Sequence, residues 1–135
     1  MGLDQSLHRT VKQKDSEGNL HLSSMHDTEI KYFRKFNALH GYMQNNNLFE
    51  GGGDDNCTPA ILDKQALINL MTTCADELCG EESQGGINPT PGFFFGSLNK
   101  DEYYRKDLLE LHAVISQTLS TFNDDDEVVY YMASY

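Results

Sequence analysis

A histidine and an asparagine inside one predicted helix are the side chains whose position most clearly suggests chemistry. Asn37 and His40 fall on the apolar face of that helix, because successive helical residues turn by about 100°. Burying them costs on the order of 1–3 kcal/mol each unless they are hydrogen-bonded. The apolar face itself is made by Ile30, Phe33, Phe36 and Met43. The pattern predicts either a structural pair bonded to the backbone or a pocket at this place.

A second candidate runs from Gly96 to Tyr104, where a glycine turn leads into the last predicted helix. Backbone N–H groups and the positive end of a helix dipole favour negative charge there, and a glycine lets a ligand approach the backbone. Ser97, Asp101 and Tyr104 add polar side chains to the segment. A plain capped helix start is the alternative interpretation, because Asp101 and Glu102 already supply negative charge. The segment lacks the Lys-Ser ending of a P-loop.

We predict that Asn37 and His40 share one hydrogen-bond network with the segment Gly96 to Tyr104. Both polar residues face inward, and the strand expected before Ser97 ends at the edge of the same core. His40 and Asp101 would then be placed to act as an acid–base pair. The candidate ligand-binding residues are accordingly Asn37, His40, Gly96, Ser97, Asp101 and Tyr104.

The other reactive residue types form no complete catalytic or metal-binding set. Cys57, Cys74 and Cys79 are an odd number, which favours free thiols. Cys74 and Cys79 would point about 140° apart on a helix, too far for a pair of metal ligands. The sequence has no serine in a nucleophile elbow and no His-x-x-x-His pair. We therefore expect no metal and no cofactor, and a binding protein is favoured over an enzyme.

Composition and charge limit the remaining functions. The chain has 135 residues, 39% of them apolar, and a formal charge of −11. We expect a single domain over residues 1–135. The negative charge disfavours direct binding to nucleic acid, although Phe93, Phe94 and Phe95 would suit base stacking. A strongly negative charge fits high solubility or a basic partner. The sequence contains no run of eighteen apolar residues, so we expect no membrane span. Residues Met1 to Lys14 lack the apolar core of a signal peptide.

Hydrophobic periodicity and capping signals predict seven elements in an α+β fold. The three helices should pack on a small sheet, with the N- and C-terminal strands paired. Turns are expected at Asp15–Asn19 and Asp124–Asp126, and Gly51–Asp55 is expected to form a loop. The predicted elements are a strand at Leu3–Thr10, a helix at Thr28–Gln44 capped by Asp27, a weak strand at Cys57–Ile61, a helix from Asp63 to Gly80, a strand at Phe93–Phe95, a helix from about Lys100 with an Asn99–Glu102 capping box, and a strand at Glu127–Tyr135.

Four segments of the sequence together resemble a known protein family. They are Met1–Asp4, Arg34–His40, Pro89–Ser97 and Asp101–Tyr104, the last of which is followed by Asp107-Leu108. In this order they are similar to small proteins encoded by tailed bacteriophages and prophages. Members typically begin Met-Gly-Leu-Asp and carry Gly-Phe-Phe-Phe-Gly-Ser before an Asp-Glu-aromatic-Tyr helix start.

The sequence departs from the pattern of this family at two places, and the resemblance implies little about mechanism. Gln5-Ser6 stands where members often have apolar or aromatic residues, and Phe33 replaces a frequent tryptophan. The resemblance implies a setting, the cytoplasm of an infected host, rather than a mechanism.

Three classes of function follow from these observations. The leading hypothesis is a phage-encoded cytosolic binding protein that modulates a host process, such as a host defence or nucleic-acid enzyme, through a host protein partner. The alternative is a small-molecule or nucleotide-binding protein, or a small enzyme, with its site between the first helix and the start of the third. A third class is an assembly protein that forms homo-oligomers through its aromatic residues.

Overall fold

The computed structural model describes residues 2–14, 16–18, 20–22, 27–49, 56–80, 86–92 and 96–135. These residues form an α+β fold of three helices and a five-stranded antiparallel sheet, the class that the sequence predicted. The elements in chain order are β1 (Asp4–Lys14), β2 (Leu20–Leu22), β3 (Thr28–Arg34), α1 (Asn37–Asn45), β4 (Ala60–Leu62), α2 (Lys64–Leu78), α3 (Glu102–Thr121) and β5 (Glu127–Ser134).

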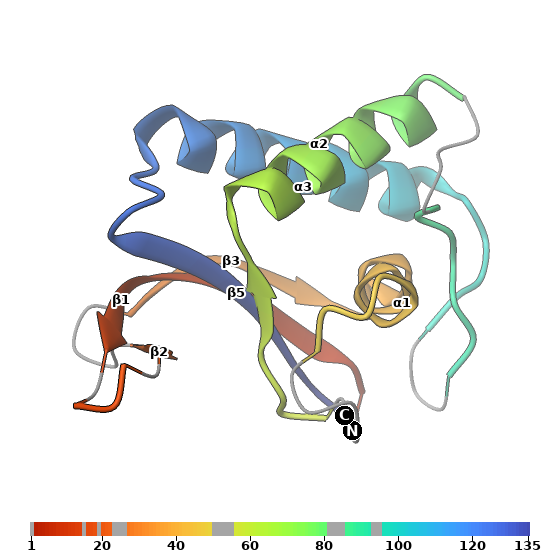
Figure 1. The fold of residues 1–135 in the computed structure, drawn as a ribbon. Coiled ribbons are helices and arrows are strands. Elements are labelled where there is room, and N and C mark those ends of the chain that lie inside the picture. The colour runs from red at the N-terminus through yellow and green to blue at the C-terminus, as the bar shows by residue number, and fades with distance from the viewer. Residues whose placement is uncertain are drawn as a thin grey trace.

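The two terminal strands form the centre of the sheet. β1 and β5 pair antiparallel from Asp4 opposite Ser134 to Val11 opposite Glu127, which confirms the predicted pairing. β4 lies on the far side of β5, while β3 and β2 pair with successive parts of the other edge of β1. Figure 1 shows the first and last strands side by side, with the two ends of the chain close together.

Helices α2 and α3 pack together over one face of the sheet, and α1 lies below this pair at the right of the view (Figure 1). Leu7 of β1 and Tyr131 of β5 share a buried core with Leu70 of α2 and Leu111 of α3. Apolar burial of this kind contributes about 25 cal/mol per Å². Leu67, Leu70 and Cys74 supply the α2 side of this core. Asp63 caps the helix by accepting a 2.8 Å bond from the Ala66 N–H.

The start of α3 differs from the predicted Asn99–Glu102 capping box. Asp101 is the N-cap, and its Oδ1 accepts the backbone N–H groups of Tyr103 and Tyr104 at 3.1 Å each. Asn99 instead donates its N–H to the Ser97 hydroxyl. An aspartate one residue before the helix satisfies two of the free N–H groups at once, so it replaces the expected pair.

The predicted helix Thr28–Gln44 is wrong in its first half. Residues Thr28–Arg34 form β3, and only Asn37–Asn45 are helical. Ile30, Phe33 and Phe36 have helical spacing, but the segment is rich in aromatic and β-branched residues, and pairing with β1 decides its conformation. Asp27, the expected N-cap, bonds to His8 and Tyr130 instead.

The chain turns from β3 into α1 through a residue in the left-handed region. Lys35 has φ +57°, and its N–H donates to the Leu3 carbonyl at 2.7 Å. Gly96, with φ +97°, lies against this turn, and a Cβ added to it would come within 3.0 Å of the Lys35 Cβ. A non-glycine residue in this region costs roughly 1 kcal/mol, so the turn is held by its surroundings.

The remaining predicted elements fall partly outside the described residues. The weak strand expected at Cys57–Ile61 is found at Ala60–Leu62, and the first strand extends beyond Thr10 to Lys14. The expected strand Phe93–Phe95 and the loop Gly51–Asp55 lie outside the described residues.

Lys35→Gly is expected to give a free energy of unfolding about 1 kcal/mol higher than Lys35→Ala, because glycine accepts positive φ without the Cβ penalty. Both variants remove the lysine side chain, so alanine is the matched control. Chemical denaturation of the two proteins measures the difference. Equal stabilities would show that the turn is not strained.

Candidate functional site

A cleft of about 350 Å³ lies between the β3–α1 turn and the start of α3. It is the place at which the sequence predicted a site. Five of the six candidate residues line it, namely Asn37, Gly96, Ser97, Asp101 and Tyr104. The rest of the lining comes from Arg34, Lys35, Phe36, Asn99, Tyr103, Lys106 and Asp107.

Asn37 joins the two walls of the cleft. Its side chain is 4% exposed; the Nδ2 donates to the Ser97 carbonyl at 2.7 Å, and the Oδ1 accepts the Thr90 N–H at 2.9 Å. Thr90 also lies so close to α1 that a Cβ on Gly41 would overlap its hydroxyl. Asn37 therefore holds the chain on both sides of residues 93–95 against α1, which confirms its predicted link to Ser97.

His40 does not belong to the cleft, and its predicted pairing with Asp101 is wrong. The histidine is fully buried, and its Nδ1 lies 2.8 Å from the Tyr131 hydroxyl in the centre of the sheet. Asp101 is exposed and caps α3. The error follows from the wrong helix bounds. A helix that began at Thr28 would have directed His40 toward the start of α3, whereas the shorter helix α1 directs it toward β5.

A buried glutamine that the sequence reasoning missed organises this part of the core. Gln5 is 1% exposed; its Oε1 accepts the Phe36 N–H at 2.8 Å, and its Nε2 donates to the Phe36 carbonyl at 2.7 Å. The same Nε2 donates to the Tyr131 hydroxyl at 3.0 Å. Because Gln5 Nε2 donates to this hydroxyl, the hydroxyl can donate its own proton to His40 Nδ1. The sequence did hold a signal for this contact: Gln5 shares one face of the predicted strand with Leu3 and Leu7, so its polar side chain faces the core and needs hydrogen-bond partners there.

Cations gather around the cleft in a chain that is otherwise strongly acidic. Six of the ten lysines and arginines lie in two short segments, residues 31–35 and 100–106. The fold brings these segments together, and Lys31 bonds to Glu110 of α3 at 3.0 Å. The cleft lining itself holds three cations, Arg34, Lys35 and Lys106, and two carboxylates, Asp101 and Asp107.

Asp107 is the carboxylate of the cleft whose ionisation is most disturbed. Burial, together with the nearby Glu110 carboxylate, raises its pKa to about 6, while Lys106 and Lys31 act in the opposite direction. A carboxyl group whose pKa is raised by folding lowers the stability of the folded protein at a pH above its folded-state pKa. It has no such effect at a pH below its unfolded-state pKa. Such a residue in a cleft is a common mark of a functional site.

A second, larger cleft of about 780 Å³ lies on the other side of the α3 start. Tyr104 lines both clefts. Its hydroxyl donates to Glu77 or to the Ile87 carbonyl, at 3.1 and 3.0 Å, and Lys100 bonds to the same Glu77 at 2.7 Å. Burial and the Glu77 carboxylate raise the pKa of Tyr104. Tyr104 is therefore an uncharged phenol at neutral pH, and it lies between the two clefts.

No candidate metal site is found among the described residues, because nowhere do three His, Cys, Asp or Glu side chains come together. The three cysteines are free, as their odd number predicted; Cys74 is buried, whereas Cys57 and Cys79 are exposed. Burial raises the pKa of the Cys74 thiol to about 12. In the described ranges, no helix has the length and apolar character needed to cross a membrane.

Comparison with known proteins gives no relative: no family model, curated protein or solved structure matches the chain. The assignment of a site therefore depends on the geometry described above.

Tyr131→Phe is expected to lower the free energy of unfolding by about 1–3 kcal/mol, because it removes the acceptor for Gln5 Nε2 and the donor to His40 Nδ1. Tyr103→Phe is the control: Tyr103 is 70% exposed, and its loss of a hydroxyl should change stability by less than about 0.5 kcal/mol. Thermal and urea unfolding of both variants test this. A Tyr131→Phe protein as stable as the control would contradict the network.

Proposed function

We propose that this protein binds a small anionic molecule in the cleft between the β3–α1 turn and the start of α3. The observation that carries the proposal is the meeting of two cation-rich segments at a cleft in a chain of net charge −11. In such a chain, a local excess of positive charge attracts an anion that the rest of the surface repels.

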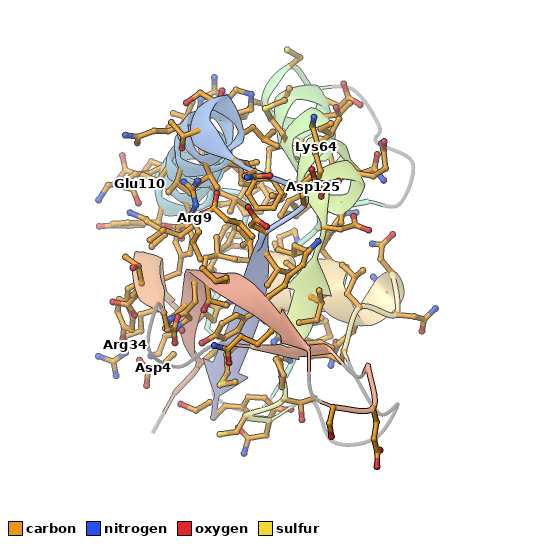
Figure 2. The ribbon with its side chains drawn as sticks, turned by 60° about the vertical axis from the view of Figure 1, so that its left-hand side comes forward. Asp4, Arg9, Arg34, Lys64, Glu110 and Asp125 are labelled. Atoms are coloured by element: carbon orange, nitrogen blue, oxygen red, sulfur yellow. The ribbon has the colours of Figure 1, made fainter. Side chains whose placement is uncertain are left out.

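The cations of the cleft have charge available for a ligand. Arg34 Nε lies 3.9 Å from Asp4, and Lys106 Nζ lies 3.7 Å from Glu110. The two side chains are 61% and 71% exposed, and exposed ion pairs of this length contribute little. Figure 2 shows Arg34 and Asp4 together at one edge of the molecule, far from Lys64. A bound anion would replace weak pairs by charge-assisted hydrogen bonds.

Nucleotides are the class of anion that best matches the lining. The cleft volume lies in the range of small-molecule sites. Tyr103, whose side chain is 70% exposed, stands on the cleft wall and offers a ring face for a base, and stacking of a base on an aromatic ring contributes about 1–3 kcal/mol. A phosphate and a planar base would thus use the two kinds of group that the cleft presents.

Binding of nucleoside monophosphates, measured by calorimetry at low salt, tests the proposal. Arg34→Gln combined with Lys106→Gln should weaken binding about tenfold or more, the equivalent of about 1.4 kcal/mol. Lys64→Gln, which removes one cation from the start of α2, is the matched control for each of the single variants Arg34→Gln and Lys106→Gln, and it should leave binding unchanged. Sulfate serves as the anion-only probe. Equal weakening by all charge changes would show unspecific attraction, and no binding by any monophosphate or sulfate would contradict the proposal.

The affinity for sulfate is expected to rise as the pH falls through about 6, because Asp107 then loses its charge. Sulfate keeps its own charge over this range, so the change reports on the protein. In Asp107→Asn the affinity should be high already at about pH 7.5 and should no longer depend on this transition. A wild-type affinity that is constant between about pH 5 and pH 8 would contradict the role of Asp107.

A second candidate function is the binding of a basic host protein. It is supported by the resemblance to tailed-phage proteins and by three consecutive exposed carboxylates, Asp124 to Asp126, in the turn before β5. Affinity capture from host cells tests it. A specific host protein should be retained by the wild type and lost when the three aspartates are changed to asparagine, and capture of nothing above background would remove this candidate.

A further inference from the structure

Ser6, His8 and Asp27 form a hydrogen-bonded chain outside the cleft. The Ser6 hydroxyl lies 2.8 Å from His8 Nε2, and His8 Nδ1 lies 3.1 Å from Asp27 Oδ1. A hydroxyl, an imidazole and a carboxylate in this order and at these distances are the arrangement that activates a serine nucleophile. We propose that Ser6 is a reactive nucleophile that accepts acyl groups from activated carboxylic esters.

The strand pairing brings the three residues together. Ser6 and His8 are two residues apart on β1, opposite Met132 and Tyr130 of β5 in a regular register, so both project from the same face. Asp27 immediately precedes β3, which pairs with β1. A helix that began at Thr28 would have placed Asp27 at its N-cap, so the sequence alone did not predict the contact between Asp27 and His8.

The orientation of the imidazole is the one that the chemistry requires. Asp27 is a carboxylate acceptor, so the ring proton lies on His8 Nδ1 and leaves Nε2 to accept the Ser6 proton. Tyr130 supports both partners: its ring stacks on His8 at 4.8 Å between centroids and 7° between planes, and its hydroxyl donates to Asp27 Oδ2 at 2.6 Å. The His8 imidazole is thus held in place by the Asp27 carboxylate and by the stacked ring of Tyr130.

The group is accessible and independent of the cleft. The His8 and Asp27 side chains are 21% and 28% exposed, and Ser6 is half-buried. None of the three lines the cleft, so reactivity at Ser6 and anion binding can be tested separately. The loss of one would leave the other intact.

The proposed reaction is acyl transfer in two steps. Ser6 Oγ attacks the carbonyl carbon of the ester while His8 Nε2 takes the hydroxyl proton, and the new Oγ–C bond replaces the C–O bond to the alcohol. The leaving alkoxide takes the proton from His8 and departs as the alcohol. Water then attacks the acyl-serine with His8 as the base, which releases the carboxylic acid and restores Ser6.

A fluorophosphonate probe tests the nucleophile directly, because Ser6 Oγ would displace fluoride and leave a stable phosphonyl-serine. Peptide mapping by mass spectrometry should find the adduct on Ser6 and not on Ser120, an exposed serine on α3 whose hydroxyl donates to the Gln117 carbonyl. Ser6→Ala should abolish the adduct, and His8→Gln and Asp27→Asn should each slow its formation at least tenfold.

Two controls keep the test decisive. Circular dichroism establishes that each variant is folded; Asp27→Asn keeps the side-chain shape if His8→Gln does not fold. Absence of any adduct on Ser6, labelling of Ser120 at the same rate, or a rate at Ser6 that does not change in folded His8→Gln or Asp27→Asn would each overturn the proposal and leave the three residues as a structural hydrogen-bond chain.

Discussion

The turn from β3 into α1 passes from the exposed residues Arg34 and Lys35 to the buried residue Phe36, and one buried side-chain amide holds Phe36 in place. A buried backbone N–H or C=O without a partner costs about 1–3 kcal/mol. Phe36 is the N-cap of α1, which has no side-chain cap of its own. Gln5 of the neighbouring strand bonds to both the N–H and the carbonyl of Phe36, and this carbonyl also accepts the Leu39 N–H at 3.2 Å. The direction in which α1 leaves the sheet depends on this contact.

The position of the cleft follows from that direction. Asn37 is the first residue of α1, so fixing Phe36 also fixes the amide that holds Thr90 and Ser97. Those two contacts hold the chain on both sides of residues 93–95, shortly before the start of α3. The polar centre of the fold therefore has a structural role, through Gln5, Tyr131 and His40, while the groups that can meet a ligand lie at its rim.

Local sequence patterns predict the parts of the fold that depend on local forces. Periodicity and turn residues predict the helix that begins after Asp63, the long α3 helix and the pairing of the terminal strands. The site at Gly96 to Tyr104 was predicted for the same reason, because a glycine turn before a helix is a local signal.

Other features depend on contacts between distant residues and could not be read from the sequence. The segment Thr28–Arg34 has helical spacing but forms a strand, since pairing with β1 outweighs its own preference. The partner of His40 lies 91 residues away, and the amide of Gln5 acts on a residue 31 positions further on. The sequence predicted an inward position for His40, but it did not show that His40 bonds to Tyr131, and it did not single out Gln5.

Hydrogen exchange at the Phe36 amide tests most directly whether Gln5 holds the turn. In the wild type this amide should exchange slowly, because its proton is bonded to a buried carbonyl oxygen. Gln5→Met keeps the length of the side chain and removes the amide, so the Phe36 amide should exchange at least tenfold faster while the amides of the β1–β5 ladder remain protected. A Phe36 amide that exchanges at the same rate in both proteins would contradict this account of the fold.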